Sequence, residues 1–331
     1  MIKAGIIGGA GYTGGELIRL LINHPYVKIT FINSNSNANK FVYEVHKDLI
    51  GETDLKFSDS FSFGEGWDEA VLFLCVGHGD ARKFLEANTI NEKIKIIDLS
   101  QDFRLSPQST VDGRQFVYGL PELNKTQIKS ANNIANPGCF ATCIQLGLLP
   151  LAKAGILGDV YTTGITGSTG AGQSLNATSH FSWRANNISA YKTLNHQHIK
   201  EIHQSLLQLQ NNFPTSNGGV HFVPWRGDFT RGIYVSSVID SSLSLEEVKE
   251  LYNSFYKDAK FTHVSNTMID LKQVVNTNKC LIHIEKQENK IIVHSATDNL
   301  LKGASGQALQ NMNLMFGLDE DEGLKLKANY F

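Results

Sequence analysis

The sequence is poor in cysteine and has no long apolar run, and each absence excludes a class of protein. Its four cysteines in 331 residues include no C-x-x-C pair, so neither a disulfide scaffold nor a metal site is expected. No apolar stretch reaches the roughly 18 to 20 residues of a membrane-spanning helix, and the first residues lack a signal-peptide layout. With a formal net charge of -2, the chain does not bind nucleic acid electrostatically. We expect a soluble, cytoplasmic protein that acts on a small molecule.

What the sequence does contain is an alternation of strands and helices over its first 140 residues. Apolar runs predict strands at 2–8, 27–33, 71–76 and 95–99, and periodic patterns predict helices at 12–23 and 81–87. Such alternation is typical of an α/β fold with right-handed crossovers. The sequence therefore predicts a Rossmann-type, doubly wound parallel sheet.

The pattern changes after residue 140, where the strands become longer and more widely separated. Strands are predicted at 160–166, 220–223, 232–239, 281–285 and 290–295, and helices at 140–154, 198–209, 245–256 and 303–316. This interleaving indicates a second domain of mixed α+β type.

A glycine-rich loop follows the first predicted strand and opens the first predicted helix. Its glycines fit a GxxGxxG variant of the dinucleotide fingerprint, although a plain tight turn is the alternative. Small residues let the backbone approach a pyrophosphate at a helix N-terminus, where amides and the helix dipole favour anions. The predicted cofactor-binding residues of the loop are Gly8, Ala10, Gly11, Tyr12, Thr13 and Gly14.

The end of the second predicted strand lacks the acidic residue with which NAD enzymes bind the ribose 2′-hydroxyl. Ser34, Ser36 and Lys40 are found there instead and could contact a 2′-phosphate. This favours NADP(H) over NAD(H), the alternative being that the three are ordinary loop residues.

Cys139 lies between a Pro-Gly turn and a predicted helix, in the Asn-Pro-Gly-Cys segment 136–139. A helix N-terminus stabilises a thiolate, and can lower its pKa well below the free value of about 8.5. Cys75, Cys143 and Cys280 lie in apolar or helical runs and are interpreted as structural. A thiolate in a nicotinamide enzyme indicates attack on an activated acyl group, then reduction of the thioester to an aldehyde.

This chemistry needs a general acid/base, and the His-Gln-His segment 196–198 is its best source. Asn195 is expected to cap a helix that begins there. His198 and Glu201 are three residues apart and share a helix face. Whether His196 or His198 meets the substrate is left open. The histidines interpreted as ordinary surface or core residues are His24, His46, His180 and His294.

Motifs along essentially the whole chain match one family. The glycine loop and the Asn-Pro-Gly-Cys segment are shared with aspartate-semialdehyde dehydrogenases, whereas Asp-Phe-Arg-Leu at 102–105 and Tyr-Gly-Leu-Pro-Glu at 118–122 are more specific. Further matches are at 98–100, 167–172, 230–232, 302–304 and 306–308. Together these segments resemble the N-acetyl-γ-glutamyl-phosphate reductases of arginine biosynthesis.

The resemblance implies that NADPH reduces N-acetyl-γ-glutamyl phosphate to the semialdehyde and phosphate. It implies Cys139 as the nucleophile and His198 as the acid/base. Arginine guanidinium groups match phosphate and carboxylate, and the implied substrate residues are Arg104, Asn136, Glu201 and Arg231. Ser168 and Gly170 are expected near the nicotinamide.

The resemblance also implies the domain organisation. The last helix, from Gly303, would return to the cofactor domain. The expected division is therefore a NADP-binding domain of residues 1–139 plus 301–331 and a catalytic, substrate and oligomerisation domain of residues 140–300. The family commonly forms homo-oligomers, either dimers or tetramers.

Three segments depart from the family pattern, at Asn35-Ser36, at Gln173 and at Gln197. They leave the acyl group open, so an N-succinyl-γ-glutamyl-phosphate reductase is one alternative and an aspartate-semialdehyde dehydrogenase is another. A non-enzymatic NADP sensor would not need Cys139. A cysteine hydrolase would have no use for the glycine loop.

Overall fold

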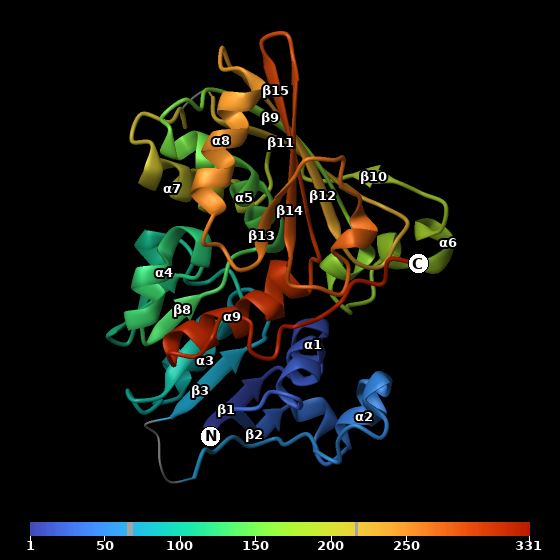
Figure 1. Ribbon diagram of the computed structural model, residues 1–331. Coiled ribbons are helices and arrows are strands. Elements are labelled where there is room, and N and C mark those ends of the chain that lie inside the picture. The colour runs from blue at the N-terminus through green and yellow to red at the C-terminus, as the bar shows by residue number, and fades with distance from the viewer. Residues whose placement is uncertain (65–68, 216–217) are drawn as a thin grey trace. The chain divides into compact units, whose positions relative to one another are not determined.

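The computed structural model describes residues 1–64, 69–215 and 218–331, which divide into two compact units (Figure 1). Unit 1 comprises Met1–Pro137 and Ala304–Lys325, and unit 2 comprises Gly138–Gly303 and Leu326–Phe331. The division differs from the expected domains at Cys139, because helix α5 (Cys139–Lys153) begins there and packs within unit 2. It differs also at the C-terminus, where the Asn276 side-chain amide donates to the Lys327 carbonyl (3.4 Å) within unit 2.

Unit 1 contains a six-stranded sheet in the order β2-β1-β3-β4-β8-β7, with all neighbours parallel. Its strands are β1 (Ile2–Ile7), β2 (Val27–Asn33), β3 (Ala70–Leu74), β4 (Lys95–Asp98), β7 (Val117–Tyr118) and β8 (Asn133–Ala135). The strand order reverses at β1, which has β2 on one side and β3 on the other. In doubly wound sheets the ligand binds at such a switch point, beyond the carboxyl ends of the strands. The predicted Rossmann-type sheet is confirmed.

The remaining elements of unit 1 are short helices and one hairpin. They are α1 (Tyr12–Leu21), η1 (Asn35–Asn37), α2 (Val42–Val45), η2 (Lys47–Leu49), α3 (Asp80–Ala87), η3 (Ser106–Gln108), β5 (Thr110–Val111), β6 (Arg114–Gln115), α4 (Pro121–Ser130) and α9 (Gly306–Met315). Helix α9 packs against α1 and α4. The last helix is shorter than the predicted 303–316, because its first part, η7 (Leu301–Ser305), is a π-helical turn.

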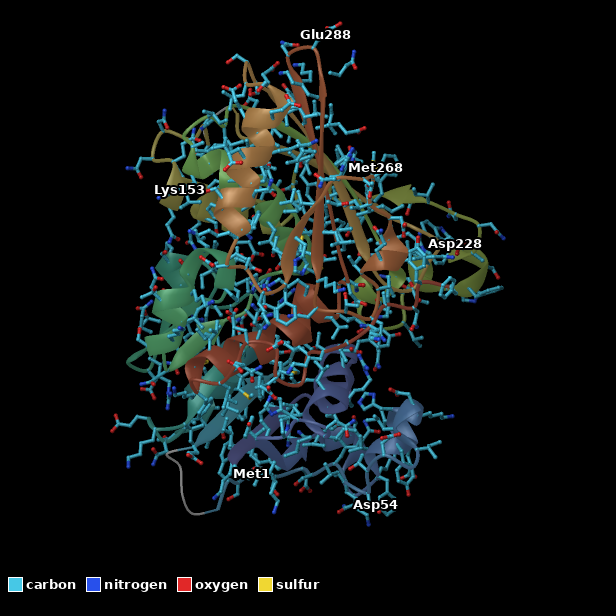
Figure 2. The ribbon with its side chains drawn as sticks, in the orientation of Figure 1. Met1, Asp54, Lys153, Asp228, Met268 and Glu288 are labelled. Carbon is cyan, nitrogen blue, oxygen red and sulfur yellow. The ribbon has the colours of Figure 1, made fainter. Side chains whose placement is uncertain are left out.

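Unit 2 contains a mixed seven-stranded sheet in the order β10-β11-β9-β12-β15-β14-β13. Its strands are β9 (Val160–Thr166), β10 (Ser189–Ala190), β11 (Val220–Arg226), β12 (Ile233–Asp240), β13 (Thr262–Ser265), β14 (Cys280–Gln287) and β15 (Lys290–Thr297). Its helices are α5, η4 (Ser168–Ala171), η5 (Ala177–Ser179), α6 (Phe181–Arg184), α7 (His198–Leu209), α8 (Leu245–Tyr256) and η6 (Leu271–Gln273). Glu288 lies in the turn between β14 and β15 (Figure 2). This confirms the mixed α+β second domain.

The two faces of the unit 2 sheet differ in burial. Helix α5 packs against β12, β14 and β15 and also contacts α7 and α8 (Figure 1). Strand β9 alternates accordingly, with Val160 and Thr162 buried and Tyr161 58% exposed between them. Within the described part of β9, the side chains that point away from Tyr161 are thus buried, and the face that carries Tyr161 is the more exposed one. Among the helices of the described ranges, none combines the length and apolarity that crossing a membrane requires.

Candidate active site

Cys139 is the first residue of α5, and Gly138 is the N-cap. Its side chain is partly exposed, whereas Cys75, Cys143 and Cys280 are buried. Burial raises the pKa of both Cys75 and Cys143 to about 12, so neither is a thiolate near neutral pH. Of the four thiols, Cys139 alone combines access with a helix N-terminus, whose amides and dipole favour an anion.

The backbone of Gly303 lies directly against Cys139. A Cβ atom at this glycine would be 2.9 Å from the Cys139 Cβ and 3.2 Å from the carbonyl oxygen of Asp298. Any side chain here would therefore displace the nucleophile. Sequence reasoning assigned this glycine only to a family motif, because nothing in the local pattern shows which residue it meets.

One carboxylate joins the cysteine helix to the predicted acid/base. Glu201 accepts a hydrogen bond from the backbone N–H of Gly138 through Oε2 (3.1 Å), and its Oε1 lies 3.8 Å from Nε2 of His198. Glu201 and His198 are 3% and 6% exposed, so water screens this pair little. The shared helix face was predicted, and the structure adds a contact to the turn that presents Cys139. Glu201 thus positions the groups on both sides of the site.

His196 performs a different task from His198. Its Nδ1 accepts the backbone N–H of His198 (3.3 Å), which caps the start of α7. The predicted cap at Asn195 is wrong, because Gln197 is the N-cap residue of α7 and the His196 ring supplies the acceptor. Burial lowers the pKa of His196 to about 4, with a further contribution from Lys192. A neutral ring with an engaged Nδ1 favours His198 as the acid/base.

Tyr191 and Arg226 belong to the surroundings of the site, although sequence reasoning missed both. The Arg226 guanidinium lies 4.8 Å from the centroid of the Tyr191 ring, and that ring packs edge-on against His196. Burial is the main cause that raises the pKa of Tyr191 to about 12, and the charge of Cys139 contributes in the same direction. The phenol therefore stays protonated at neutral pH and can donate a hydrogen bond.

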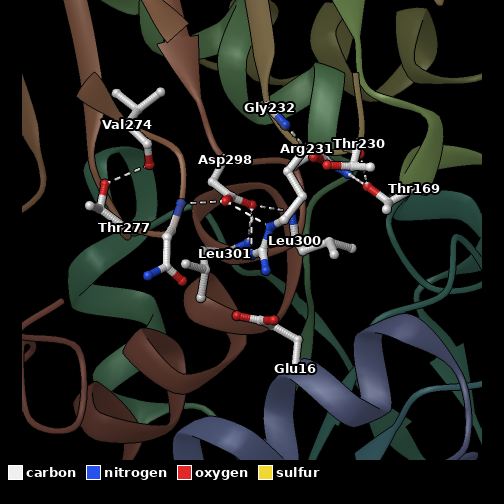
Figure 3. A network of polar contacts seen from close by, with 12 residues as sticks. Glu16, Thr169, Thr230, Arg231, Gly232, Val274, Thr277, Asp298, Leu300 and Leu301 are labelled. Carbon is white, nitrogen blue, oxygen red and sulfur yellow. Dashed lines mark hydrogen bonds and ion pairs between the residues drawn. The ribbon is translucent and has the colours of Figure 1, made fainter. Parts of the chain in front are cut away.

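Arg231 forms a bidentate ion pair with Asp298 (Figure 3). Both N···O distances are 3.0 Å, and the carboxylate is fully buried. The same carboxylate accepts the backbone N–H groups of Asn276, Leu300 and Leu301. Asp298 thus fixes the plane of the Arg231 guanidinium and the loop that leads to Gly303.

Replacing Asp298 with asparagine should destabilise the protein by about 3–5 kcal/mol, because the Arg231 charge would lose its buried partner. Asp240→Asn is the matched control, since Asp240 is exposed and pairs with the exposed Lys290 at 2.6 Å. It should cost less than about 1 kcal/mol. Urea unfolding of both variants measures the difference. Equal losses would show that burial of the Arg231 pair contributes nothing special.

Two of the predicted substrate residues brace the backbone of unit 1. The Arg104 side chain donates to the carbonyls of Asn136 (2.9 Å) and Leu99 (3.1 Å). The Asn136 side chain donates to the carbonyl of Ala304 (3.0 Å) and accepts from Asn311 (3.1 Å). Both residues are buried. Their contact with substrate stays a prediction, whereas their bracing of the β4 and β8 strand ends is observed.

The glycine loop between β1 and α1 fits a dinucleotide. Gly8 has φ +80°, and a Cβ there would lie 2.5 Å from the carbonyl oxygen of Cys75. A Cβ at Gly14 would lie 2.7 Å from the Gly8 carbonyl oxygen, whereas at Gly11 the nearest atom is 3.9 Å away. The N-cap residue of α1 is Gly11, which has no side chain to bond the first amides. The first amides of this helix therefore remain available to a phosphate.

The residues predicted to contact the 2′-phosphate form one cluster after β2. The Asn37 amide donates to the hydroxyls of Ser34 and Ser36 at 3.2 Å each, and Lys40 Nζ donates to Asn37 Oδ1 at 3.2 Å. Sequence reasoning missed Asn37, which links the other three. The cluster is polar and carries a cation, so its chemistry suits a phosphate.

The predicted nicotinamide residues lie in unit 2. Ser168 begins the short helix η4, and its backbone N–H bonds to the carbonyl of Phe229 (2.8 Å). Gly170 is exposed in the same turn. Their contact with the nicotinamide stays a prediction.

Two family models match the chain. The model described as "Semialdehyde dehydrogenase, NAD binding domain" matches residues 3–131, and "Semialdehyde dehydrogenase, dimerisation domain" matches residues 139–299. An aspartate semialdehyde dehydrogenase II from Vibrio cholerae has a similar fold, with a TM-score of 0.72 and 15% identity over 96% of this chain and 98% of that one. The enzyme from Candida albicans, solved with NADP, gives 0.68 and 15% over 96% and 99%. Fold and site together define a two-domain oxidoreductase of the semialdehyde dehydrogenase class.

Curated relatives narrow the class. Proteins named N-acetyl-gamma-glutamyl-phosphate reductase from Bacteroides thetaiotaomicron and Phocaeicola vulgatus are each 57% identical to this chain, and one from Flavobacterium johnsoniae is 52% identical. Every one of these matches covers 100% of both chains. The chain belongs to the N-acetyl-gamma-glutamyl-phosphate reductase family.

Proposed function

We propose that this protein uses NADPH to reduce N-acetyl-γ-glutamyl phosphate to the semialdehyde and inorganic phosphate, through a thioester on Cys139. The observation that carries the proposal is the chain of contacts from the Gly138 N–H through Glu201 to His198. Through these contacts the Glu201 carboxylate lies against both the turn that precedes Cys139 and the imidazole of His198. The names of the full-length relatives support the same substrate.

The first half-reaction is acyl transfer. The Cys139 thiolate attacks the acyl carbon, a carbon–sulfur bond forms, and phosphate leaves with the electrons of the carbon–oxygen bond. The first amides of α5 lack intrahelical acceptors and would stabilise the oxyanion. Arg231, with its plane fixed by Asp298, is our candidate for the phosphate or carboxylate of the substrate.

The second half-reaction is reduction. When bound, NADPH supplies a hydride to the thioester carbon. His198 then removes the hydroxyl proton of the resulting hemithioacetal. Its collapse expels the Cys139 thiolate and releases the aldehyde. Glu201 orients His198 in this step and, through Gly138, holds the turn that presents the sulfur.

An assay in the reverse direction tests the substrate. Purified protein receives phosphate and NADP with one of three aldehydes: N-acetylglutamate semialdehyde, N-succinylglutamate semialdehyde or aspartate semialdehyde. NADPH formation should be fastest with the N-acetyl compound and at least about tenfold slower with the others. Turnover of aspartate semialdehyde alone would overturn the proposal, and turnover only with the succinyl compound would reassign the acyl group.

We propose further that the protein forms a homo-oligomer through the open face of the unit 2 sheet. Tyr161 on this face is 58% exposed and stacks on His221, with ring centroids 4.8 Å apart. Partly exposed Tyr234, Val238 and Ile292 lie on the neighbouring strands. An apolar face of this kind is typical of a subunit interface, and the matching family model is described as a dimerisation domain.

Tyr161→Asp should shift the protein toward monomers, because it places a charge in this interface. Sedimentation equilibrium measures the change. Tyr26→Asp is the control, since Tyr26 is 49% exposed and lies in unit 1. If both variants keep the mass of the wild type, the proposed face is not the interface.

A further inference from the structure

His46 contacts the glycine loop, although its sequence context suggested only an ordinary surface or core residue. Its Nε2 lies 2.8 Å from the carbonyl oxygen of Gly9. Because a carbonyl only accepts, Nε2 carries the hydrogen and donates. We propose that His46 is a positioning residue of the dinucleotide site, which holds the loop in its pyrophosphate-binding conformation. The inference rests on the proposed use of NADPH.

The geometry of one peptide group gives the contact its consequence. The carbonyl of Gly9 and the N–H of Ala10 belong to the same planar trans peptide, so they point in opposite directions. When His46 holds the Gly9 oxygen on one side, the Ala10 N–H points to the other. Glycine flanks this peptide and resists rotation little. Without His46, a flip of the peptide would replace an amide donor with a carbonyl oxygen that repels phosphate.

The loop is held at its other end as well. The N–H groups of Gly8 and Gly9 both donate to the carbonyl of Asn33, at 3.1 and 3.0 Å. A Cβ at Gly9 would lie 2.2 Å from a methyl carbon of Ile32, so β2 packs directly under the loop. β2 therefore fixes the amides of Gly8 and Gly9, and His46 fixes the carbonyl of Gly9.

Gly15 makes room for the His46 ring. A Cβ at Gly15 would lie 2.5 Å from both Cε1 and Nδ1 of that ring. The ring also packs against Phe57, with centroids 6.1 Å apart. A methyl group at position 15 would consequently push the imidazole away from Gly9. Gly15 thus leaves the space that the His46 ring needs in order to reach the carbonyl of Gly9.

The same short segment links the two phosphate sites. Lys40 belongs to the Asn37 cluster, Val42 starts α2, and His46 is the C-cap residue of this helix. The segment is anchored on the next one by hydrogen bonds from Val42 N–H to the Leu55 carbonyl (2.8 Å) and from Phe57 N–H to the Lys40 carbonyl (3.0 Å). One end thus faces the site for the 2′-phosphate, and the other holds the pyrophosphate loop.

The test measures dissociation constants of NADPH and NADH for the purified full chain by calorimetry. His46→Phe keeps a ring and removes the donor, and it should weaken both nucleotides by the same factor, about 3- to 10-fold. His46→Gln retains an N–H donor and should recover part of the loss. Lys40→Ala is the contrasting variant and should weaken NADPH only. Unchanged affinity in His46→Phe, or a loss confined to NADPH, would overturn the inference.

A double-mutant cycle tests the pairing with Gly15. Gly15→Ala should weaken NADPH binding about 3-fold or more in the wild type, and should have no further effect in His46→Ala, where no ring remains to be displaced. Alanine favours the helix, so α1 itself should not be weakened. An equal loss in both backgrounds would contradict the role of His46. If the wild type binds neither nucleotide, the proposed function fails instead.

Discussion

Replacing Cys139 with alanine is expected to lower kcat by at least about a thousandfold, because no other group can form the acyl intermediate. Cys139→Ser should be nearly as inactive, because a serine hydroxyl stays protonated at neutral pH and is a much weaker nucleophile than a thiolate. The three other thiols cannot substitute, as all are buried. Steady-state rates with N-acetyl-γ-glutamyl phosphate and NADPH measure the effect.

Cys280→Ala is the control for this experiment. Cys280 lies in β14, is fully buried and belongs to no part of the proposed machinery. It should keep kcat within about twofold, while losing some stability to the cavity. Equal losses of activity in the Cys139 and Cys280 variants would indicate damage to the fold rather than loss of a nucleophile.

His198→Gln is expected to lower kcat by roughly 10²- to 10⁴-fold, the usual contribution of a general acid/base. His196→Asn separates the two histidines, because its Oδ1 can still accept the N–H of His198. It should cost less than about tenfold. The reverse ranking of the two variants would transfer the acid/base role to His196.

The free energy of unfolding should depend on pH more strongly in the wild type than in His196→Asn. The folded pKa of His196 is about 4, below the ordinary value of 6.5. Its neutral form therefore stabilises the fold above about pH 6.5, and that stability is lost as the pH falls toward 4, by up to roughly 3 kcal/mol. Urea unfolding at pH 7 and pH 4.5 should show a smaller acid loss for His196→Asn than for the wild type.

Most of the long elements were predictable because their patterns are local, although the ten-residue helix α4 was missed. Strand β2 at Val27–Asn33, and helices α7 and α8, have the predicted bounds. Strands β7 and β8 were missed, since two or three residues are too few to show a period. Register and strand order depend on contacts between distant segments, so only the general parallel topology could be inferred.

The site divides in the same way. The positions of Cys139 and His198 at helix starts follow from their neighbours in sequence, and both could be inferred. The bond from Gly138 to Glu201 spans 63 residues and the Arg231–Asp298 pair spans 67, so neither leaves a local pattern. The imidazole cap at His196 was missed because the expected cap residue, Asn195, looked sufficient. Contacts that position catalytic groups were therefore the hardest part to predict.

The proposed mechanism depends on a thioester at Cys139, and rapid acid quenching can trap this acyl-enzyme. The protein is mixed with N-acetyl-γ-glutamyl phosphate in the absence of NADPH, quenched, digested and mapped by mass spectrometry. We expect close to one acyl group per chain, on the peptide that contains Cys139, with release of an equal amount of phosphate. The adduct should disappear when NADPH is added. An unmodified Cys139 in protein that turns over with NADPH would contradict it, as would an adduct on another residue.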